Sequence, residues 1–510
     1  MAGRWRTRAV LATSLGCAAC GLVYELGLLN LAGVLVGSSV RTSSLVLGVF
    51  VCAMGAGSIL SKPLAARPLA AFVGVEAALA VVGGVSGPAL YAAFAWFEVY
   101  ELAALGFAVA IGALIGAEIP LLMALIGRLR EARASDDAAD IMAADYVGAL
   151  VAGGAFPFLL VPLFGLVRTS LVAGLVNVVL AGGAVLAVGT TRRRKLVAAG
   201  ALVPAALVML LAVVRVGDWV VSVRQRLYDD PIVHAEQTAY QEIVLTRSTD
   251  GRDLRLFLDG DLQFSSVDEY RYHEALVHPA MSSGSGAHEQ VLVLGGGDGL
   301  VAREVLRYPD VERLVQVELD PAMTSLARDL GALAGINDRA LEDPRVELVH
   351  DDAFTWTADR ARAGDQRFDV VVVDFPDPDR LDLVRLYSEE MYRAIGAVLA
   401  PGGRVVVQAG SPYFAREAFW SVERTVGAAG FVTVPYHVDV PSFGDWGFVL
   451  GGREALEPAL DADVETRFLT DEVLAASRVF GADAGPVDVE VNTIDNPVLA
   501  EYTERGWSSY

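Results

Sequence analysis

Residues 290–299 read Gln-Val-Leu-Val-Leu-Gly-Gly-Gly-Asp-Gly, and this stretch decides the fold of the second half of the chain. The run 290–294 predicts a buried strand that opens directly into a glycine-rich turn, and residues 300–307 predict a helix. A second predicted strand, 313–317, ends at Glu318, about twenty residues after the glycines. In nucleotide-binding βαβ units the glycines allow close backbone approach, and the acid accepts ribose hydroxyls. We therefore predict an α/β Rossmann-like domain of the class I methyltransferase type.

Acidic residues follow further predicted strands of this domain. The run 346–349 leads to Asp351 and Asp352, and the run 368–373 leads to Asp374. Another strand is predicted at 403–408, after a Pro-Gly-Gly turn. One such acid could be a helix cap, but the repetition favours a shared role. Ligands of open α/β sheets bind at the carboxyl ends of the strands, so we expect these acids at a binding site.

The segment before this domain has the pattern of β-hairpins. Two alternating runs, 234–246 and 254–264, flank a Ser-Thr-Asp-Gly turn, and a second turn is predicted at Leu258-Asp259-Gly260-Asp261. The last residues carry no chemical motif and are expected to pack on the core or on a partner subunit. The predicted soluble units are a linker at 217–230, a β-hairpin substrate domain at 231–283, the Rossmann-like domain at 284–452 and a C-terminal tail at 453–510.

The first 216 residues have the composition of a membrane domain. Hydrophobic residues make up 54% of the 510-residue chain, and their excess lies in this part. Seven stretches are long and apolar enough to cross a bilayer, which predicts a multi-pass helical domain of about seven helices in the cell membrane. These stretches are 9–36, 43–61, 68–96, 101–127, 146–167, 169–189 and 196–214.

Basic residues are distributed unevenly among the loops between these stretches. One side carries most of them, and the positive-inside rule assigns that side to the cytoplasm. With seven spans the second half of the chain would then lie outside, whereas the chemistry inferred below favours the cytoplasm. The membrane side of the soluble domain is therefore left open. The basic residues on the richer side are Arg4, Arg6, Arg8, Lys62, Arg67, Arg128, Arg130, Arg133 and 192–195.

Three glutamates, Glu25, Glu76 and Glu118, lie within the apolar stretches. An ionisable group at mid-membrane costs about 2.5–3.5 kcal/mol on insertion scales and usually faces the bundle interior. One hypothesis is a pathway for organic cations. The alternative is that these are protonated or hydrogen-bonded structural residues.

Net charge and motif content exclude several function classes. The formal net charge is -22, which disfavours nucleic acid as a partner and suits cationic substrates or simple solubility. The cysteines Cys17, Cys20 and Cys52 lie in apolar runs, and we interpret the first two as packing residues. The sequence has no zinc-binding spacing, so no metal is predicted. It also lacks the lysine of a phosphate-binding loop and the nucleophile elbow of a serine hydrolase.

An ordered set of motifs resembles the spermidine synthase (polyamine aminopropyltransferase) family. The set extends from Gln237 to about Leu450, and the apolar half resembles the membrane-anchored bacterial branch. The motifs are Tyr240-Gln241-Glu242-Ile243, Leu258-Asp259-Gly260 with Gln263, Asp268-Glu269-Tyr270-Arg271-Tyr272-His273-Glu274, 291–299 with Arg303-Glu304, Glu318-Leu319-Asp320, Asp351-Asp352-Ala353, 374–378 and Leu386-Tyr387-Ser388-Glu389.

The resemblance implies a homodimer that uses decarboxylated S-adenosylmethionine as co-substrate, with a polyamine acceptor and no other cofactor. It also implies roles for individual residues. Asp374 would be the proton acceptor and Asp377 would hold the amine. Gln241, Glu318, Asp352 and Ala353 would bind the thioadenosine part of the donor, and Tyr272, His273, Asp298 and Gln263 would line the aminopropyl and polyamine channel.

Such a reaction explains the need for carboxylates. An alkylamine has a pKa near 10.4, so at pH 7 a neutral nucleophile costs about 4–5 kcal/mol. A positioned carboxylate attracts the ammonium and accepts its proton as the new bond forms. The donor already carries a positive sulfur, so neither a metal nor a covalent intermediate is required.

Some positions depart from the family pattern and leave the acceptor amine open. Phe375-Pro376 stands where soluble members carry small hydroxyl residues, Asp379-Arg380-Leu381 replaces a Gly-Pro loop, and Val440 replaces a substrate-binding tyrosine. Two other functions are considered. One is an S-adenosylmethionine-dependent methyltransferase, and the other is a polyamine transporter or sensor whose soluble domain only binds ligand.

Overall fold

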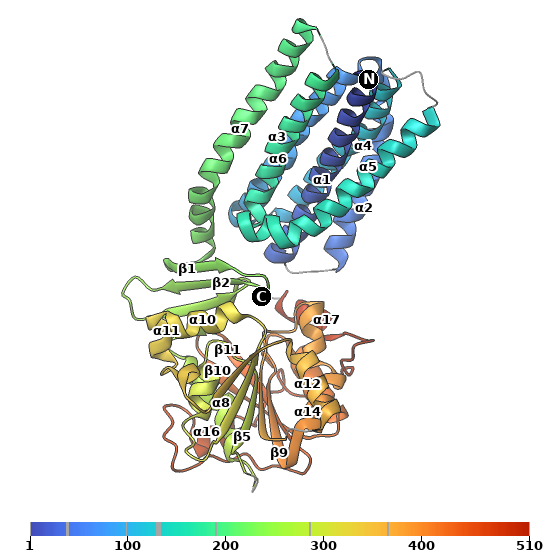
Figure 1. Cartoon of the computed structure of the whole chain (residues 1–510). Helices are drawn as coiled ribbons and strands as arrows, with labels where there is room; N and C mark the ends of the chain where they lie inside the picture. Colours follow the sequence, from blue (N-terminus) through green and yellow to red (C-terminus); the bar gives the residue numbers. More distant parts are fainter. Residues whose placement is uncertain are drawn as a thin grey trace. The chain divides into compact units, whose positions relative to one another are not determined.

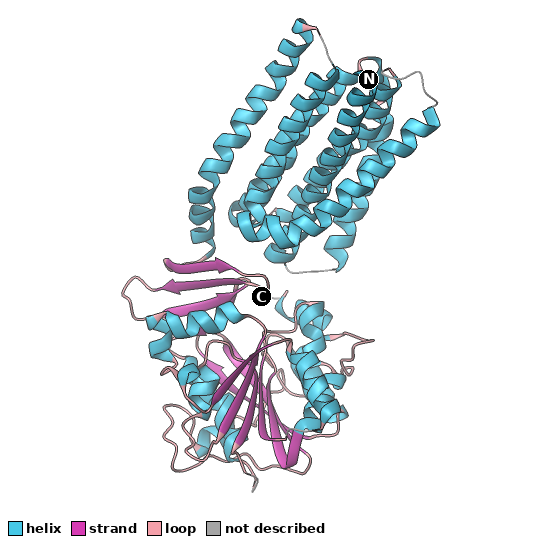
Figure 2. Cartoon of the chain, viewed as in Figure 1, coloured by secondary structure: helices cyan, strands magenta, loops and turns pink. Residues whose placement is uncertain are grey.

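The computed structural model describes residues 2–36, 40–97, 99–128, 134–188, 191–284, 287–364 and 367–508. The chain divides into two compact units, Met1–Asp229 and Asp230–Tyr510. The first unit is helical, whereas the second combines strands and helices (Figures 1 and 2). Each unit has its own hydrophobic clusters.

The helices of the first unit pack through small residues. A Cβ added to Gly57 would lie 1.9 Å from the backbone oxygen of Ala113, and one added to Gly116 would lie 1.9 Å from that of Met54. Glycine therefore permits the close approach of α2 and α4, as is common in membrane bundles. The elements are α1 (Ala2–Val36), α2 (Val40–Leu60), η1 (Lys62–Ala66), α3 (Pro68–Phe97), α4 (Tyr100–Gly127), α5 (Ala134–Ala155), η2 (Phe156–Leu160), α6 (Val161–Val188), α7 (Arg192–Arg224) and η3 (Gln225–Leu227).

Among the described residues, six helical segments are long and apolar enough to cross a membrane. One of them has 50 residues, enough for two crossings, so the predicted count of seven stays a prediction. The predicted stretches 146–167 and 169–189 belong to one continuous apolar segment, Ala139–Val188, which bends at Gly165 (φ 71°, ψ 165°). The predicted linker at 217–230 was wrong over its first half, because α7 continues to Arg224 and a 3-10 turn follows it. The residues 217–224 are apolar enough, with Trp and Val, to extend the preceding helix.

The second unit begins with a four-stranded antiparallel sheet in the order β1-β2-β3-β4. Its strands are β1 (Ile232–Gln237), β2 (Glu242–Arg247), β3 (Leu254–Leu258) and β4 (Asp261–Ser265). The run 234–246 is thus two strands, because residues 238–241 turn the chain back. The turn predicted at 258–261 is confirmed, with Asp259 at φ 50° and Gly260 at φ 100°, the left-handed values that a two-residue hairpin turn requires.

A seven-stranded sheet follows in the order β10-β11-β9-β8-β5-β6-β7. The strands β5 to β9 are mutually parallel where they pair, and β11 is antiparallel to both β9 and β10. The predicted Rossmann-like arrangement is confirmed. The strands are β5 (Gln290–Gly295), β6 (Arg313–Glu318), β7 (Val346–His350), β8 (Phe368–Asp374), β9 (Leu399–Gln408), β10 (Val432–Val440) and β11 (Gly444–Gly452).

Helices cover both faces of this sheet, with α8, α10 and α11 on one side and α12, α14 and α17 on the other (Figure 1). Two hydrophobic clusters correspond to these faces. The remaining elements are α8 (Glu269–Ser282), α9 (Leu300–Val305), α10 (Pro321–Asp329), α11 (Gly331–Ile336), η4 (Ala340–Glu342), α12 (Ala353–Ala363), α13 (Leu381–Val384), η5 (Arg385–Tyr387), α14 (Glu389–Val398), α15 (Arg416–Ala428), α16 (Asp471–Ala476) and α17 (Leu499–Trp507).

The C-terminal tail is an integral part of the second unit. Leu469 and Leu474 belong to the cluster on one face of the sheet, and Leu499 belongs to the cluster on the other. The side-chain amide of Asn492 donates to the backbone oxygens of Val384 (3.0 Å) and Tyr387 (3.1 Å). The tail therefore packs on the core of its own chain.

Candidate functional site

The carboxyl ends of β5, β6 and β8 bring the glycine turn and two predicted acids together. Gly295 pairs with Asp374, and a Cβ at Gly295 would lie 2.1 Å from the backbone oxygen of Asp374. A Cβ at Gly297 would lie 2.7 Å from a carboxylate oxygen of Glu318. Glycine at these positions therefore lets the strand ends close around the acids.

Asp374 is the last residue of β8, and its carboxylate is held by Tyr272 of α8. The Tyr272 hydroxyl donates to Asp374 Oδ1 at 2.6 Å. Burial raises the pKa of Asp374 to about 6, an effect that the positive charge of His273 counteracts and the negative charge of Asp298 reinforces. Asp374, Tyr272, His273 and Asp298, four of the predicted residues, thus lie within one electrostatic environment.

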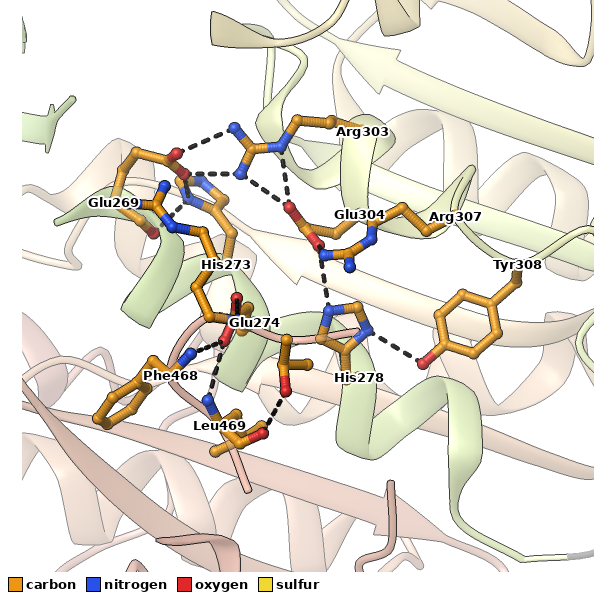
Figure 3. Close-up of polar contacts among 12 residues, drawn as sticks. Glu269, His273, Glu274, His278, Arg303, Glu304, Arg307, Tyr308, Phe468 and Leu469 are labelled. Atoms are coloured by element: carbon orange, nitrogen blue, oxygen red, sulfur yellow. Dashed lines mark hydrogen bonds and ion pairs between the residues drawn. The ribbon is translucent and has the colours of Figure 1, made fainter. Parts of the chain in front are cut away.

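His273 is oriented by neighbours that were not predicted as site residues (Figure 3). Its Nδ1 lies 2.8 Å from the backbone oxygen of Glu269 and 2.9 Å from Glu269 Oε2, so this nitrogen carries a hydrogen. Arg303 donates to both carboxylate oxygens of Glu269, at 2.9 and 2.8 Å. Burial alone would lower the pKa of His273, but the Glu269 carboxylate reverses this and raises it. The Glu269 carboxylate thus favours the protonated form of His273.

The network continues away from the site along α9. Arg303 Nε donates to Glu304 at 2.8 Å, and Glu304 also lies 3.1 Å from Nε2 of the buried His278. His278 Nδ1 is 3.0 Å from the Tyr308 hydroxyl (Figure 3). The Arg303-Glu304 pair was noted only as part of a motif, and the structure shows that it braces α8, which carries Tyr272 and His273.

Asp377 lies just beyond β8 and contacts a residue that the sequence analysis missed. The side-chain amide of Gln408, at the end of β9, donates to Asp377 Oδ1 at 3.3 Å and to the backbone oxygen of Phe375 at 2.7 Å. Burial raises the pKa of Asp377 to about 7, and the charges of Asp379 and Asp261 add to this effect. Gln408 could have been found from the sequence, because it ends a predicted strand of the same sheet. It was missed because only charged residues at strand ends were considered.

Three of the other predicted donor-binding residues lie at or just after the ends of β6 and β7, whereas Gln241 lies in the turn between β1 and β2. Glu318 ends β6, and burial raises its pKa to about 7 although the backbone N–H of Asp320 donates to its Oε1 at 2.9 Å. The Gln241 amide donates to Asp320 Oδ2 at 3.1 Å, which ties the four-stranded sheet to this edge. Asp352 caps α12 by accepting from the Thr355 N–H at 2.9 Å, and Ala353 is the buried first residue of that helix.

Arg380 and Val440 are two of the positions that depart from the family pattern, and Asp352 is held by a neighbouring arginine. Asp352 forms an ion pair with Arg385 at 2.5 Å. In the loop that replaces Gly-Pro, Arg380 binds Asp259 of the β3–β4 turn at 2.6 Å. Val440 is fully buried. Gln263 lies on β4 and donates to the backbone oxygen of Asp261 at 3.2 Å, so its predicted role in a channel stays a prediction.

Taken together, the described residues form an acidic site suited to cations. Burial raises the pKa values of Glu318, Asp374 and Asp377 to about 6 or 7, and that of Asp298 is raised by the same cause. A cation that binds between these carboxylates favours their ionised form and is attracted by it. A carboxyl group whose pKa lies near neutrality is also suited to accept a proton.

Comparison with known proteins gives consistent matches. The spermine/spermidine synthase domain family matches residues 269–457. The chain is 50% identical to polyamine aminopropyltransferase 1 of Streptomyces coelicolor, over 97% of this chain and 93% of that protein. It is 48% identical to polyamine aminopropyltransferase of Mycobacterium tuberculosis, over 99% and 97% of the two chains.

Two solved structures are also similar. One is spermidine synthase from Thermotoga maritima, with a TM-score of 0.42 and 25% identity, covering 49% of this chain and 84% of that chain. The other is a spermidine synthase in complex with the transition-state analogue AdoDATO, with a TM-score of 0.43 and 23% identity, covering 55% and 89%.

Proposed function

The chain belongs to the polyamine aminopropyltransferase family, and from this premise we propose how its acidic site performs the transfer. The enzyme transfers an aminopropyl group from decarboxylated S-adenosylmethionine to a polyamine, forming spermidine or a related product and methylthioadenosine. The observation that carries the proposal is the Tyr272–Asp374 hydrogen bond of 2.6 Å at the edge of the sheet beside the glycine turn. Membership of this family argues against the alternative that the chain is a methyltransferase.

The donor is assigned to the edge formed by β6 and β7. Glu318 accepts the ribose hydroxyls above Gly297, where the absence of a side chain leaves room for a close approach. Asp352 and Ala353 bind the adenine side, and Gln241 contributes from the four-stranded sheet through its contact with Asp320. The ion pair between Asp352 and Arg385 holds the Asp352 carboxylate at the start of α12.

The transfer is a direct displacement at carbon. The acceptor nitrogen forms a bond to the aminopropyl carbon that is attached to sulfur. The bond between this carbon and sulfur breaks, and its electron pair moves to sulfur, which becomes a neutral thioether. Asp374 accepts the proton that the amine loses. Tyr272 holds the Asp374 carboxylate in position, and Asp377, Asp298 and the channel residue Gln263 attract the amino groups. Orientation by several fixed carboxylates reduces the entropic cost of bringing two cations together.

Mass spectrometry tests this proposal directly. The purified full-length protein in detergent is incubated with decarboxylated S-adenosylmethionine and a panel of diamines and polyamines. We expect methylthioadenosine together with one amine that has gained an aminopropyl group. Absence of product with every amine, despite measurable donor binding, would instead support the binding or transport alternative.

The acid limb of the pH profile reports the ionisation of the site. Both Asp374 (pKa about 6) and Asp377 (pKa about 7) are raised by burial, so each carboxylate gains a proton as the pH falls through that value. We expect kcat/KM to fall below about pH 7 and to fall more steeply below about pH 6, because kcat/KM reports the free enzyme. The acid limb of the kcat profile should lie at lower pH, because the bound cations stabilise the ionised form of the carboxylates.

The control for the pH profile is Asp377→Asn. This change removes one of the two groups whose pKa is about 7, the other being the donor-binding residue Glu318. With the donor saturating, so that Glu318 is already occupied, the remaining limb of kcat/KM for the amine should move towards the value of Asp374, about 6. A profile of kcat/KM that stays flat from about pH 7.5 to about pH 5.5 would contradict the assignment of these carboxylates.

We also propose that the first unit anchors the enzyme in a membrane. The support is the set of six helices that are long and apolar enough to cross a bilayer, together with their exposed apolar side chains, such as Leu150 at 77% and Leu102 at 73%. The chain should remain with the membrane fraction after alkaline carbonate washing, and its release would contradict anchoring. The homodimer and the membrane side of the active site stay predictions.

A further inference from the structure

Three helices of the first unit bring a thiol and two carboxylates together at one point. Cys17 of α1, Glu76 of α3 and Glu118 of α4 each present a potential ligand atom, and these atoms lie within 4.8 Å of one another. Cys17 and Glu76 are fully buried, and Glu118 is 3% exposed. Cys17 was interpreted as a packing residue, but its sulfur lies beside the two carboxylates.

These carboxylates have almost no polar partners. Among the described residues, only the Cys17 thiol and Glu118 lie close enough to interact directly with the Glu76 carboxylate. Glu118 Oε1 also has no hydrogen-bond donor among these residues. An ionised carboxylate buried without a partner costs several kcal/mol, and two adjacent ones repel each other strongly. The group therefore requires a neutralising cation or shared protons.

The group lies well inside the apolar part of the unit. Cys17, Glu76 and Glu118 are eight or nine residues from Arg8, Pro68 and Gly127, which end their helical spans. This separation corresponds to about 12–14 Å of helix rise. Glu25 lies two turns further along α1 and is only half-buried, so the three predicted membrane glutamates do not form a single group.

The combination of one sulfur and two carboxylate ligands favours one class of cation over others. Alkali and alkaline-earth ions prefer oxygen ligands alone, and an ammonium group has no need of a thiolate. Zinc and similar divalent transition metals accept thiolate sulfur together with carboxylate oxygen, in a compact tetrahedral arrangement. Three ligands from three helices would leave one position for a water molecule or a second carboxylate oxygen.

We propose that Cys17, Glu76 and Glu118 form a binding site for a divalent transition metal of the zinc type, which links α1, α3 and α4. The metal offsets the charges of the two buried carboxylates and takes the place of the hydrogen bonds that they lack. The Cys17 thiol releases its proton when it binds the metal, so the ligated group carries one net negative charge. Half-buried Asp145 of α5 adds negative charge near Glu118. This site is separate from the aminopropyl transfer reaction and does not depend on it.

Cobalt substitution tests the site, because a cobalt–thiolate bond gives a charge-transfer band that histidine and carboxylate ligands do not produce. The full-length protein, purified in detergent without a histidine tag, is stripped with a chelator and titrated with Co²⁺. We expect the band to saturate at one equivalent, and Zn²⁺ should remove it by competition. Absence of the band in the wild-type protein would overturn the proposal.

The three cysteines of the chain provide matched controls. Cys17→Ser should abolish the band, whereas Cys20→Ser and Cys52→Ser should retain it, although Cys20 is also buried on α1. The double variant Glu76→Gln, Glu118→Gln keeps the size of both side chains and should weaken cobalt binding by at least about 10–100-fold. A band that persists in Cys17→Ser, or unchanged affinity in the double variant, would show that the carboxylates share protons and that this group is not a metal site. Helical circular dichroism and the elution volume of each variant in detergent check that the first unit is folded.

Discussion

Asp374→Asn is expected to abolish aminopropyl transfer while leaving donor binding in place. The substitution preserves the shape of the side chain and can still accept a hydrogen bond from Tyr272. It cannot accept the proton of the attacking amine, and loss of a positioned general base lowers a rate by about 10²–10⁴-fold. Single-turnover kinetics with saturating donor and acceptor measures this step.

Donor affinity distinguishes a catalytic role of Asp374 from a general loss of structure. Binding of decarboxylated S-adenosylmethionine to the variant, followed by calorimetry, should stay within a few-fold of the wild-type value. Asp359→Asn is a suitable control, because Asp359 is exposed on α12 and pairs only with Arg362 among the described contacts. A rate constant for Asp374→Asn within about tenfold of the wild type would exclude it as the proton acceptor.

Glu274→Ala is expected to destabilise the second unit strongly. The Glu274 side chain is buried and accepts hydrogen bonds from three backbone N–H groups of the tail, those of Arg467 (2.6 Å), Phe468 (2.9 Å) and Leu469 (2.9 Å). Figure 3 shows the contacts with Phe468 and Leu469. Alanine would leave these donors without this partner. The Leu469 N–H is buried and the other two are part-buried, and an unpaired buried donor costs about 1–3 kcal/mol. We expect the free energy of unfolding to fall by roughly 3–5 kcal/mol.

Thermal unfolding of the full-length protein in detergent measures this effect. The melting temperature of the second unit should fall by roughly 5–15 °C. Glu347→Ala is the matched control, because its carboxylate is 53% exposed and pairs with Arg313 on the surface. Exposed ion pairs contribute about 0–1 kcal/mol, so this control should change little. Equal shifts for the two variants would show that Glu274 does not anchor the tail.

Much of the catalytic half could be predicted from local sequence patterns. The strand, glycine turn, helix and second strand from Gln290 to Glu318 were found where they were expected. The acids Glu318 and Asp374 could be placed at one edge because the carboxyl ends of parallel strands necessarily lie on the same side of a sheet. The β3–β4 turn was predictable because Asp259-Gly260 accepts the required left-handed backbone.

Other features could not be recognised from local patterns. The break between β1 and β2 depends on a turn in which Thr238 and Gln241 bind Asp320, which is distant in sequence. Gln408 was overlooked because an uncharged residue at a strand end has no distinctive pattern until Asp377 lies beside it. The predicted linker was wrong in its first half, because apolar residues after a helix can continue that helix as well as form a connecting segment.

The sequence by itself determined the two-unit organisation, the order of the strands along the chain and the acidic binding edge, because these follow from hydrophobic periodicity and from the geometry of parallel strands. Only the tertiary structure decided which side chains meet across helices. Glu269 and Arg303 meet beside His273, and Cys17 meets Glu76 and Glu118, because of how each helix is rotated and packed. Such rotations depend on the fit of many side chains at once, so residue spacing along the chain does not reveal them.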